Sequence, residues 1–283
     1  MAHELIGIDH LILGMRDLDA ARTRYARLGF NSTPRGRHVG WGTANYCIML
    51  ERDYLELLGI VDPSQFTNRL DQFLAEREGL MSVALGSRDL AATRAAWLAA
   101  GLAPQEPRAL GRLLEANGGT IELRFRNLML PPEDVAGLRL FALEHLTPEP
   151  MRRPAWLAHP NGARAIRSCT VAVSDPAPLA AALRRVFGAA AITATDNVVA
   201  AHTGHGVMLV APPEDAMLLH PQLELPAYIA EPLPIAMTLE VADPKRAASF
   251  LRLQGVRFER GPSGDLLVPP DEAGGVALEL VSG

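Results

Sequence analysis

Hydrophobic and polar positions follow one arrangement that occurs four times along the chain. An apolar run of strand character is followed by an aspartate, an amphipathic stretch and a glycine in residues 8–30, 80–102, 166–189 and 235–256. Apolar residues in the amphipathic stretch recur with a helical period. Each copy therefore predicts one strand and one helix, and repetition of this unit predicts a modular fold.

The aspartate and the glycine mark where each predicted helix begins and ends. The spacing is 12 residues for Asp17 to Gly29, Asp89 to Gly101 and Asp243 to Gly255, and 13 for Asp175 to Gly188. An aspartate at the N-cap accepts backbone N–H groups, and Pro176 and Pro244 follow at the first helical position, where no donor is needed. The glycine supplies the left-handed residue that ends the helix.

Short apolar or alternating runs bounded by turn residues predict further strands after each glycine. They lie at residues 38–50, 54–60, 119–130, 138–143, 197–202, 207–210 and 276–281. Each copy is thus predicted to be a βαβββ module. A separate helical pattern at 63–78 predicts a packing helix between the first two modules.

The expected fold class is α+β, with four βαβββ modules paired into two half-barrel domains. The N-terminal domain is expected at 1–150, with modules at 6–60 and 79–146, and the C-terminal domain at 165–283, with modules at 165–212 and 233–282. Several prolines and an Asn-Gly pair predict a linker at 151–164. Two ways of pairing the modules stay open: they pair in chain order, or the first module pairs with the fourth.

Composition narrows the class of protein. The chain has 283 residues, a formal net charge of −5 and 48% hydrophobic residues, which predicts about two globular domains and not a nucleic-acid binder. No apolar run is long enough to span a membrane, and the N-terminal residues show no export signal. Cys47 and Cys169 form no metal or disulfide pattern. A cytoplasmic protein with a small-molecule partner is expected, and a homodimer is one option.

Several segments resemble a glyoxalase-like branch of the vicinal-oxygen-chelate superfamily. They are residues 37–45, 54–58 (YLELL), 143–145 (LEH) and 159–162 (HPNG), so the resemblance covers roughly residues 6 to 165. The C-terminal half is similar only at the level of the module. The resemblance implies a cup around a site, with a divalent metal held by a first-strand residue and a last-strand glutamate from each paired module.

Carried over by position, the resemblance implies that His10, Glu56 and Glu144 bind a divalent metal such as Zn, Mn, Ni or Fe. Ser82 stands where the second module would supply its first-strand ligand, and Glu279 is the one match in the C-terminal pair. Imidazole and carboxylate donors suit such metals, and a ligating carboxylate could also move a proton. Glu144 or Glu56 is therefore the expected catalytic base.

Other polar residues are expected to bind substrate or to have structural roles. The expected substrate-binding residues are Arg37, His38, Trp41, Asn45 and Ser82. His202 and His205 flank a glycine and predict a hairpin turn instead of a metal pair. His145, His159 and Asn161 are expected to fix the linker.

The leading functional hypothesis is a metal-dependent lyase or isomerase that acts on a small oxygen-rich molecule in the N-terminal cup. One alternative is a metal-free protein that binds or sequesters a small molecule. An extradiol-type dioxygenase ranks lower, because two histidines and one carboxylate would be expected as its ligands. A ligand-free scaffold that dimerises through sheet edges, with solvated glutamates and His10 in the core, is a further alternative.

Overall fold

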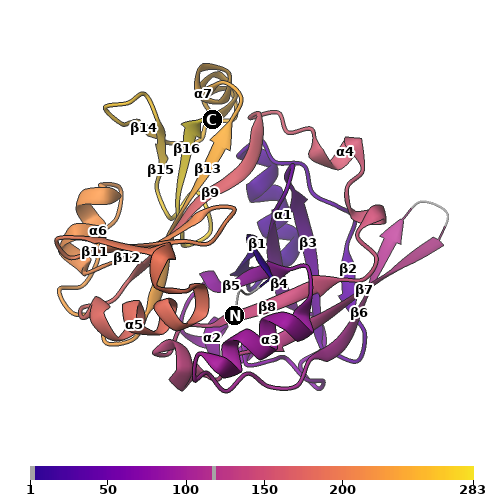
Figure 1. Ribbon diagram of the computed structural model, residues 1–283. Helices are drawn as coiled ribbons and strands as arrows, with labels where there is room; N and C mark the ends of the chain where they lie inside the picture. Colours follow the sequence, from indigo (N-terminus) through magenta and orange to yellow (C-terminus); the bar gives the residue numbers. More distant parts are fainter. Residues whose placement is uncertain (1–3, 117–118) are drawn as a thin grey trace.

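The described part of the chain contains two sheets of eight strands each, and one of these sheets closes into a barrel (Figure 1). The computed structural model describes residues 4–116 and 119–283. Residues 1–3, on which the expectation of no export signal partly rests, lie outside this part. No helix in the described ranges is long and apolar enough to cross a membrane.

The element order β-α-β-β-β occurs four times, as the repeat predicts. The first module has β1 (Leu5–Gly14), α1 (Leu18–Arg27), β2 (Gly36–His38), β3 (Thr43–Met49) and β4 (Tyr54–Ile60). After α2 (Leu70–Glu76), the second has β5 (Gly79–Ser87), α3 (Leu90–Ala99), β6 (Arg108–Ala116), β7 (Gly119–Met129) and β8 (Leu140–His145). The short helix α4 (Pro154–Leu157) follows.

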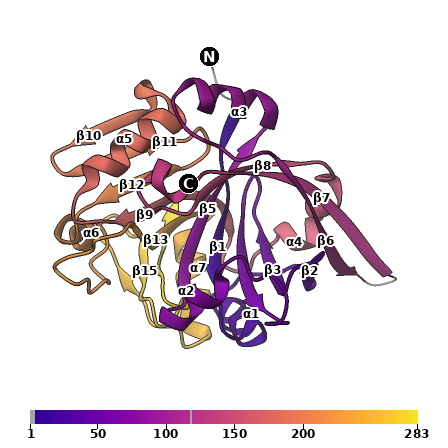
Figure 2. The same ribbon diagram turned by 90° about the horizontal axis from the view of Figure 1, so that it is seen from below.

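The C-terminal half repeats this order. The third module has β9 (Ala163–Ala172), α5 (Pro176–Phe187), β10 (Ile192–Thr195), β11 (Val198–His202) and β12 (Val207–Ala211). After α6 (Pro213–Leu219), the fourth has β13 (Leu233–Val241), α7 (Pro244–Leu253), β14 (Glu259–Arg260), β15 (Leu266–Val268) and β16 (Ala277–Ser282). Figure 2 shows α3 and α5 on neighbouring parts of the two halves.

The predicted helix boundaries are confirmed at all four copies. The side chains of Asp17, Asp89, Asp175 and Asp243 each accept backbone N–H groups of the first helical turn. The glycine that follows each helix has a positive φ, at 88° for Gly29, 77° for Gly101, 86° for Gly188 and 66° for Gly255. These local interactions explain why the frame could be predicted from sequence.

Modules pair in chain order. Strand β1 is antiparallel to β5, and β9 is antiparallel to β13, while each module's first strand is parallel to its own last strand. The expected N-terminal half-barrel is corrected to a closed barrel, ordered β1-β4-β3-β2-β6-β7-β8-β5. Strand β6, which the sequence pattern did not predict, pairs with both β2 and β7 and so closes the seam.

The C-terminal sheet stays open, with β10 and β14 at its edges. Helix α6 and the chain after it pack over part of this sheet, where Ala216, Leu223 and Ile229 meet Ala172 and Ala236. The homodimer remains a prediction.

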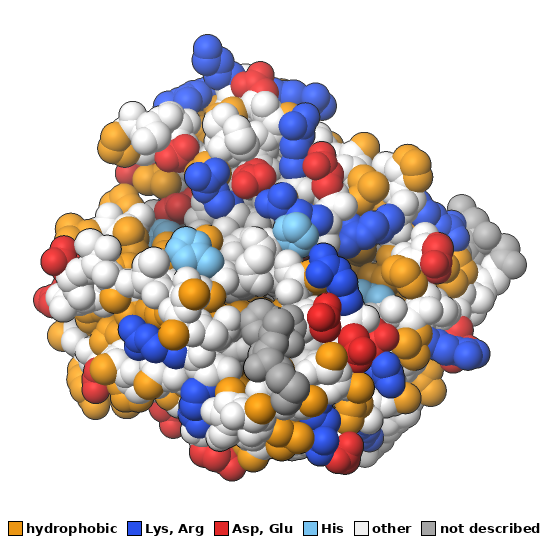
Figure 3. All heavy atoms as spheres, viewed as in Figure 1, with side chains coloured by type: hydrophobic (Ala, Val, Ile, Leu, Met, Phe, Trp, Pro, Cys, Tyr) orange, Lys and Arg blue, Asp and Glu red, His pale blue; other side chains and the backbone are white. Residues whose placement is uncertain are grey.

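On the face seen in Figure 3, Lys and Arg side chains are interspersed with Asp and Glu, so this face offers no continuous basic surface of the kind that nucleic acid binds.

Two element predictions are corrected. Residues 38–50 do not form one strand, because a turn separates β2 from β3, and Gly42 approaches the backbone carbonyl of Asp62 so closely that a side chain would not fit. Within the helix predicted at 63–78, only α2 is helical, and Phe66 lies before its first residue. Tertiary contacts thus override the local pattern in both segments.

Backbone and side-chain bonds join the two sheets. His205 exchanges hydrogen bonds with β1, since Ile8 N donates to His205 O at 2.8 Å and His205 N donates to Ile6 O at 2.9 Å. The indole of Trp97 donates to Val186 O at 3.1 Å. His202 and His205 lie at the β11–β12 hairpin, as predicted. The barrel and the open sheet therefore share contacts besides the connecting chain, while the domain limits at 150 and 165 stay predictions.

The chain between β8 and β9 is fixed by polar side chains, as predicted for His159 and Asn161. His159 Nε2 donates to Met49 O at 2.8 Å, and its Nδ1 accepts from Asn31 N at 3.1 Å. Asn161 is fully buried, where its amide donates to Leu28 O at 2.9 Å and accepts from Ala163 N at 2.9 Å. Burial lowers the pKa of His159, so the neutral imidazole fits this role.

Candidate active site in the barrel

The closed barrel contains a cavity of about 730 Å³, which is large enough for a small molecule. Its walls are mostly apolar, with Ile12 of β1, Leu58 of β4, Met81 of β5, Phe125 of β7 and Phe141 of β8. A few polar side chains interrupt this surface and lie close to one another. An apolar chamber with a small polar cluster is typical of ligand and active sites.

His10 is the centre of the polar cluster. It is 4% exposed, its Nδ1 lies 2.7 Å from Asp9 Oδ1, and its Nε2 lies 3.4 Å from Glu56 Oε2. The ring of Tyr54 stacks on the imidazole with centroids 4.3 Å apart. Burial alone would lower the pKa of His10, but the hydrogen bonds to Asp9 and Glu56 raise it above its ordinary value. His10 is therefore suited to carry a proton.

Asp9 reaches the cluster through an irregularity in β1. Ile8 pairs with Leu85 and His10 with the next residue, Ala84, so Asp9 is an extra residue in the strand. Its carboxylate bonds His10 and also lies 3.1 Å from Nε2 of His145. Burial alone would raise the pKa of Asp9, but His145 and His10 outweigh it and hold the pKa well below the usual range.

Glu56 lies between two imidazoles. Its Oε2 faces His10, while its Oε1 lies 3.7 Å from His38 Nε2 and accepts a hydrogen bond from Asn45 Nδ2 at 2.5 Å. Burial alone would raise the pKa of Glu56, but His10, and then His38 and Arg112, hold it at about 2. Glu56 is therefore an ionised carboxylate inside the barrel.

His38 differs from His10 in its surroundings. Its Nδ1 lies 2.9 Å from the hydroxyl of Thr43, which orients the ring so that Nε2 faces Glu56. Burial lowers the pKa of His38, and the opposing charge of Glu56 does not restore it. The two histidines on either side of Glu56 thus have pKa values displaced in opposite directions.

Glu144 does not join His10 and Glu56. Its carboxylate lies 2.5 Å from Arg126 Nη2 and accepts from Leu90 N at 3.4 Å. Alternation along β8 puts Leu143 and His145 on the cavity side and Glu144 on the outer face. The expected convergence of three ligands is corrected to two, and His145, expected to fix the linker, lines the cavity instead.

The expected substrate-binding residues divide into two groups. His38, Trp41 and Ser82 line the cavity, and Asn45 bonds Glu56 behind it. Arg37 lies on the other face of β2, exposed and paired with Glu115 at 3.4 Å, so it does not face the cavity. The functional roles of the first four remain predictions.

Four residues of the site were missed from the sequence: Tyr54, Arg112 and His145 line the cavity, and Asp9 bonds His10 outside its lining. A charged residue inside an otherwise apolar strand is the pattern that could have marked Asp9, because an unpaired buried carboxylate is costly. Arg112 could not have been found in this way, since strand β6 itself was not predicted. Arg112 is 4% exposed, and its Nη1 donates to Cys47 Sγ at 2.7 Å.

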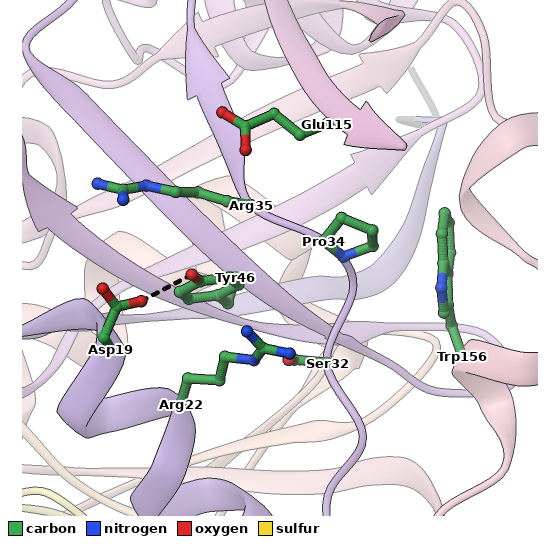
Figure 4. Close-up of a pocket in the computed structure, with 8 residues that line it drawn as sticks. All are labelled: Asp19, Arg22, Ser32, Pro34, Arg35, Tyr46, Glu115 and Trp156. Carbon is green, nitrogen blue, oxygen red and sulfur yellow. Dashed lines mark hydrogen bonds between the residues drawn. The ribbon is translucent and has the colours of Figure 1, made fainter. Parts of the chain in front are cut away.

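A second hollow of about 590 Å³ lies on the outer side of the barrel (Figure 4). Asp19 and Arg22 of α1 lie beside Tyr46, and Trp156 of α4 stands on the opposite side. The hydroxyl of Tyr46 donates to Asp19 at 2.7 Å, and the guanidinium of Arg22 lies 5.1 Å from the ring centre. The polar groups of this hollow thus interact with one another.

The ligand positions that the superfamily implies do not carry a complete set of metal donors. Ile12 pairs with Glu56 between β1 and β4, and the equivalent pair between β5 and β8 is Ala84 with Phe141, so a phenyl ring stands in the place of a second carboxylate. The hydroxyl of Ser82 donates to Arg139 O at 2.9 Å. Residues 4–116 and 119–283 contain no group of three His, Cys, Asp or Glu side chains that could hold a metal ion. The donors therefore do not fit a metal.

The C-terminal sheet has its own polar cluster around Glu279. His220, which follows α6, lies 2.6 Å from Glu279 Oε1 and 2.7 Å from the hydroxyl of Thr170. Thr238 donates to the other carboxylate oxygen at 3.0 Å. In this half, Glu279 corresponds to Glu56, and its carboxylate is therefore already hydrogen-bonded by side chains of the protein.

Sequence comparison decides the family. The profile of the glyoxalase-like domain family matches residues 8–187, which include the whole barrel and the first strand and helix of the open sheet. The chain belongs to this family. It is a glyoxalase-like protein of the vicinal-oxygen-chelate superfamily, whose members often bind metal, and no curated protein gives a significant sequence match.

Solved structures share the fold at low sequence identity. A hypothetical protein from Staphylococcus aureus is 12% identical with a TM-score of 0.70, and the match covers 98% of this chain and 99% of that one. A xylose isomerase-like TIM barrel/4-hydroxyphenylpyruvate dioxygenase fusion protein is 14% identical with a TM-score of 0.61, covering 99% and 49%. A mutant of 4-hydroxymandelate synthase from Streptomyces coelicolor is 12% identical with a TM-score of 0.60, covering 99% and 92%. These likenesses show the fold alone.

Replacing Glu56 with Gln is expected to flatten the acid dependence of stability. Because the pKa of Glu56 falls from 4.5 to about 2 on folding, the ionised form stabilises the protein above pH 4.5, and this contribution is lost as pH falls toward 2. It is on the order of 3 kcal/mol. Urea denaturation of Glu56→Gln at pH 7 and at pH 3 is expected to show a smaller difference than in the unaltered protein.

The matched control for this experiment is Glu122→Gln, since Glu122 is an exposed carboxylate that pairs with the exposed Arg124. This variant is expected to follow the unaltered protein at both pH values, because exposed pairs contribute little. Equal acid dependence in Glu56→Gln and the unaltered protein would contradict the assignment of an ionised, stabilising Glu56.

The donor geometry also predicts how the protein responds to metals. Protein purified without chelator is expected to carry only trace zinc, manganese, nickel or iron by elemental analysis. Added Zn²⁺ or Mn²⁺ is expected to leave the Tm unchanged, because an ion that does not bind the folded state cannot stabilise it. About one equivalent of metal that disappears in the His10→Ala, Glu56→Ala double variant would contradict this expectation.

Proposed function

We propose that the barrel cavity binds a small oxygen-rich molecule and catalyses proton transfer on it, as a lyase or isomerase that needs no metal. His10 is the proton donor, His38 is the proton acceptor, and Glu56 holds both. The observation that carries this proposal is the placement of two imidazoles, His10 buried and His38 half-buried, against the two oxygens of one carboxylate in the wall of the cavity.

The environments of the two histidines support these roles. Two groups of one chemical type, whose pKa values are displaced in opposite directions, are suited to act as acid and base at the same pH. The pKa of His10 is raised by Asp9 and Glu56, so His10 keeps its proton. The pKa of His38 is lowered by burial, so this ring is free to accept a proton. Asp9 fixes the ring of His10 from behind, as Thr43 does for His38.

The reaction follows from this placement. His38 takes a proton from a carbon next to a carbonyl, and His10 gives its proton to the carbonyl oxygen, which yields an enol. If the deprotonated carbon carries a hydroxyl, this hydroxyl gives its proton to His10 while His38 returns a proton to the former carbonyl carbon, which completes an isomerisation. If the next carbon carries a leaving group, this group departs with the proton from His38 while the enol returns its proton to His10, which completes an elimination. The apolar walls exclude water, which strengthens the electrostatic effect of Glu56 on both rings.

A binding protein without catalysis is the second candidate function. The observation that favours it is the apolar lining of the cavity, in which Ile12, Phe125 and Phe141 could hold a hydrophobic compound with no chemistry. Tight binding with no proton transfer would support this candidate over the first.

Deuterium exchange tests the proposed proton transfer without knowledge of the natural substrate. Small aldehydes, ketones, 2-oxo acids and 2-hydroxy acids are incubated with the protein in D₂O, and label at carbon is followed by NMR. The unaltered protein is expected to accelerate exchange in at least one class. His38→Asn is expected to lower this rate by about 100-fold or more, in the range of general base catalysis.

His202→Asn is the matched control, because His202 is exposed on β11 outside the barrel. It is expected to exchange at the rate of the unaltered protein. No acceleration with any compound class, or equal rates in the His38 and His202 variants, would rule out the proposed chemistry.

A further inference from the structure

Arg112 is a buried cation that forms no ion pair with a carboxylate in residues 4–116 and 119–283. It projects from β6 into the barrel, lines the cavity and is 4% exposed. Nη1 donates to the sulfur of Cys47, and Nε is buried without a hydrogen-bond partner. A guanidinium is always charged and has five N–H donors, and here the Nε–H is left unsatisfied while one Nη1–H meets only a sulfur.

Cys47 does not supply the missing negative charge. Burial raises the pKa of this thiol to about 11, so the sulfur is neutral at physiological pH and is a weak acceptor. Glu56 attracts Arg112 electrostatically, but its oxygens face His10, His38 and Asn45 and form no ion pair with the guanidinium. Burial of a charge without a directly bonded counterion is unfavourable. An anionic ligand would remove this cost.

The neighbouring backbone is built to admit the Arg112 side chain. A Cβ atom at Gly36 would lie 2.9 Å from Cδ of Arg112 and 2.4 Å from Oδ1 of Asn45. Only a glycine leaves this space free, so β2 accommodates the stem of the arginine on its way into the cavity. The position of Arg112 is thus specified by a second strand and not only by its own.

Strand register places Arg112 beside the proposed base. His38 of β2 and Arg112 of β6 are direct partners across the antiparallel pair, so their side chains leave the same face of the sheet. A carboxylate bound by Arg112 would therefore present its adjacent carbon next to His38. The rest of such a ligand would lie against apolar wall residues such as Leu123 and Phe125.

We propose that Arg112 binds the carboxylate of the substrate, so that the substrate is a small organic acid with an apolar body. This inference rests on the proposed function, since it assigns the substrate class of the same cavity. A guanidinium and a carboxylate form two parallel hydrogen bonds, and such a charged pair in a dry site is strong and specific. Arg112 is a substrate-binding residue in this account and takes no part in proton transfer.

The test compares two probes with the same apolar body by isothermal titration calorimetry, the anionic carboxylate 4-phenylbutyrate and the neutral alcohol 4-phenylbutanol. The unaltered protein is expected to bind the acid at least about tenfold more tightly, which corresponds to about 1.4 kcal/mol. Arg112→Met is expected to abolish this preference. Arg37→Met, the same substitution on the exposed side of β2, is expected to retain it.

Circular dichroism spectra check that the Arg112→Met variant is folded. Arg112→Gln is measured as a second variant, since glutamine keeps a polar group without the charge. Equal binding of acid and alcohol by the unaltered protein, or a preference that survives in a folded Arg112 variant, overturns the inference. These outcomes leave the proton-transfer proposal intact, because both probes still occupy the cavity. Binding of neither probe overturns the inference as well, and the deuterium-exchange test then decides the proposed function separately.

Discussion

The candidate site depends on mutual compensation among three buried titratable side chains inside a closed barrel. Asp9, His10 and Glu56 are each less than a tenth exposed, and each is bonded to the next. Isolated, any one of these ionised groups would be costly in an apolar interior. Together they form a chain of alternating charge, so the arrangement of the cluster is fixed by electrostatics as well as by the strands that hold it.

Closure of the barrel extends this row of charged side chains with a residue from the second module. The pairing of β2 with β6 brings Arg112 beside His38, which the strand order β2-β3-β4 of the first module already holds near Glu56. An open half-barrel, as expected from sequence, would leave both side chains at a sheet edge in contact with water. The short strand β2 and the unpredicted strand β6 therefore matter more for the chemistry than their lengths suggest.

Sequence reasoning succeeded where structure is set locally and failed where it is set by pairing. The aspartate caps and helix-ending glycines involve neighbours in the chain, so all four βαβββ modules could be predicted. The faces of Glu144 and His145 are set by the register of β8 with β5 and β7, and a shift of one residue exchanges them. Asp9 joins the cluster because it is an extra residue in the pairing of β1 with β5, and the sequence of β1 alone does not reveal this irregularity.

A nitrogen NMR titration of His10 and His38 tests the central claim most directly, since the account requires the two rings to differ in charge in the resting protein. Near pH 6.5, the ordinary pKa of histidine, His10 is expected to be the imidazolium and His38 the neutral ring. Titration of both rings together near pH 6.5, or protonation of His38 before His10, would contradict the account.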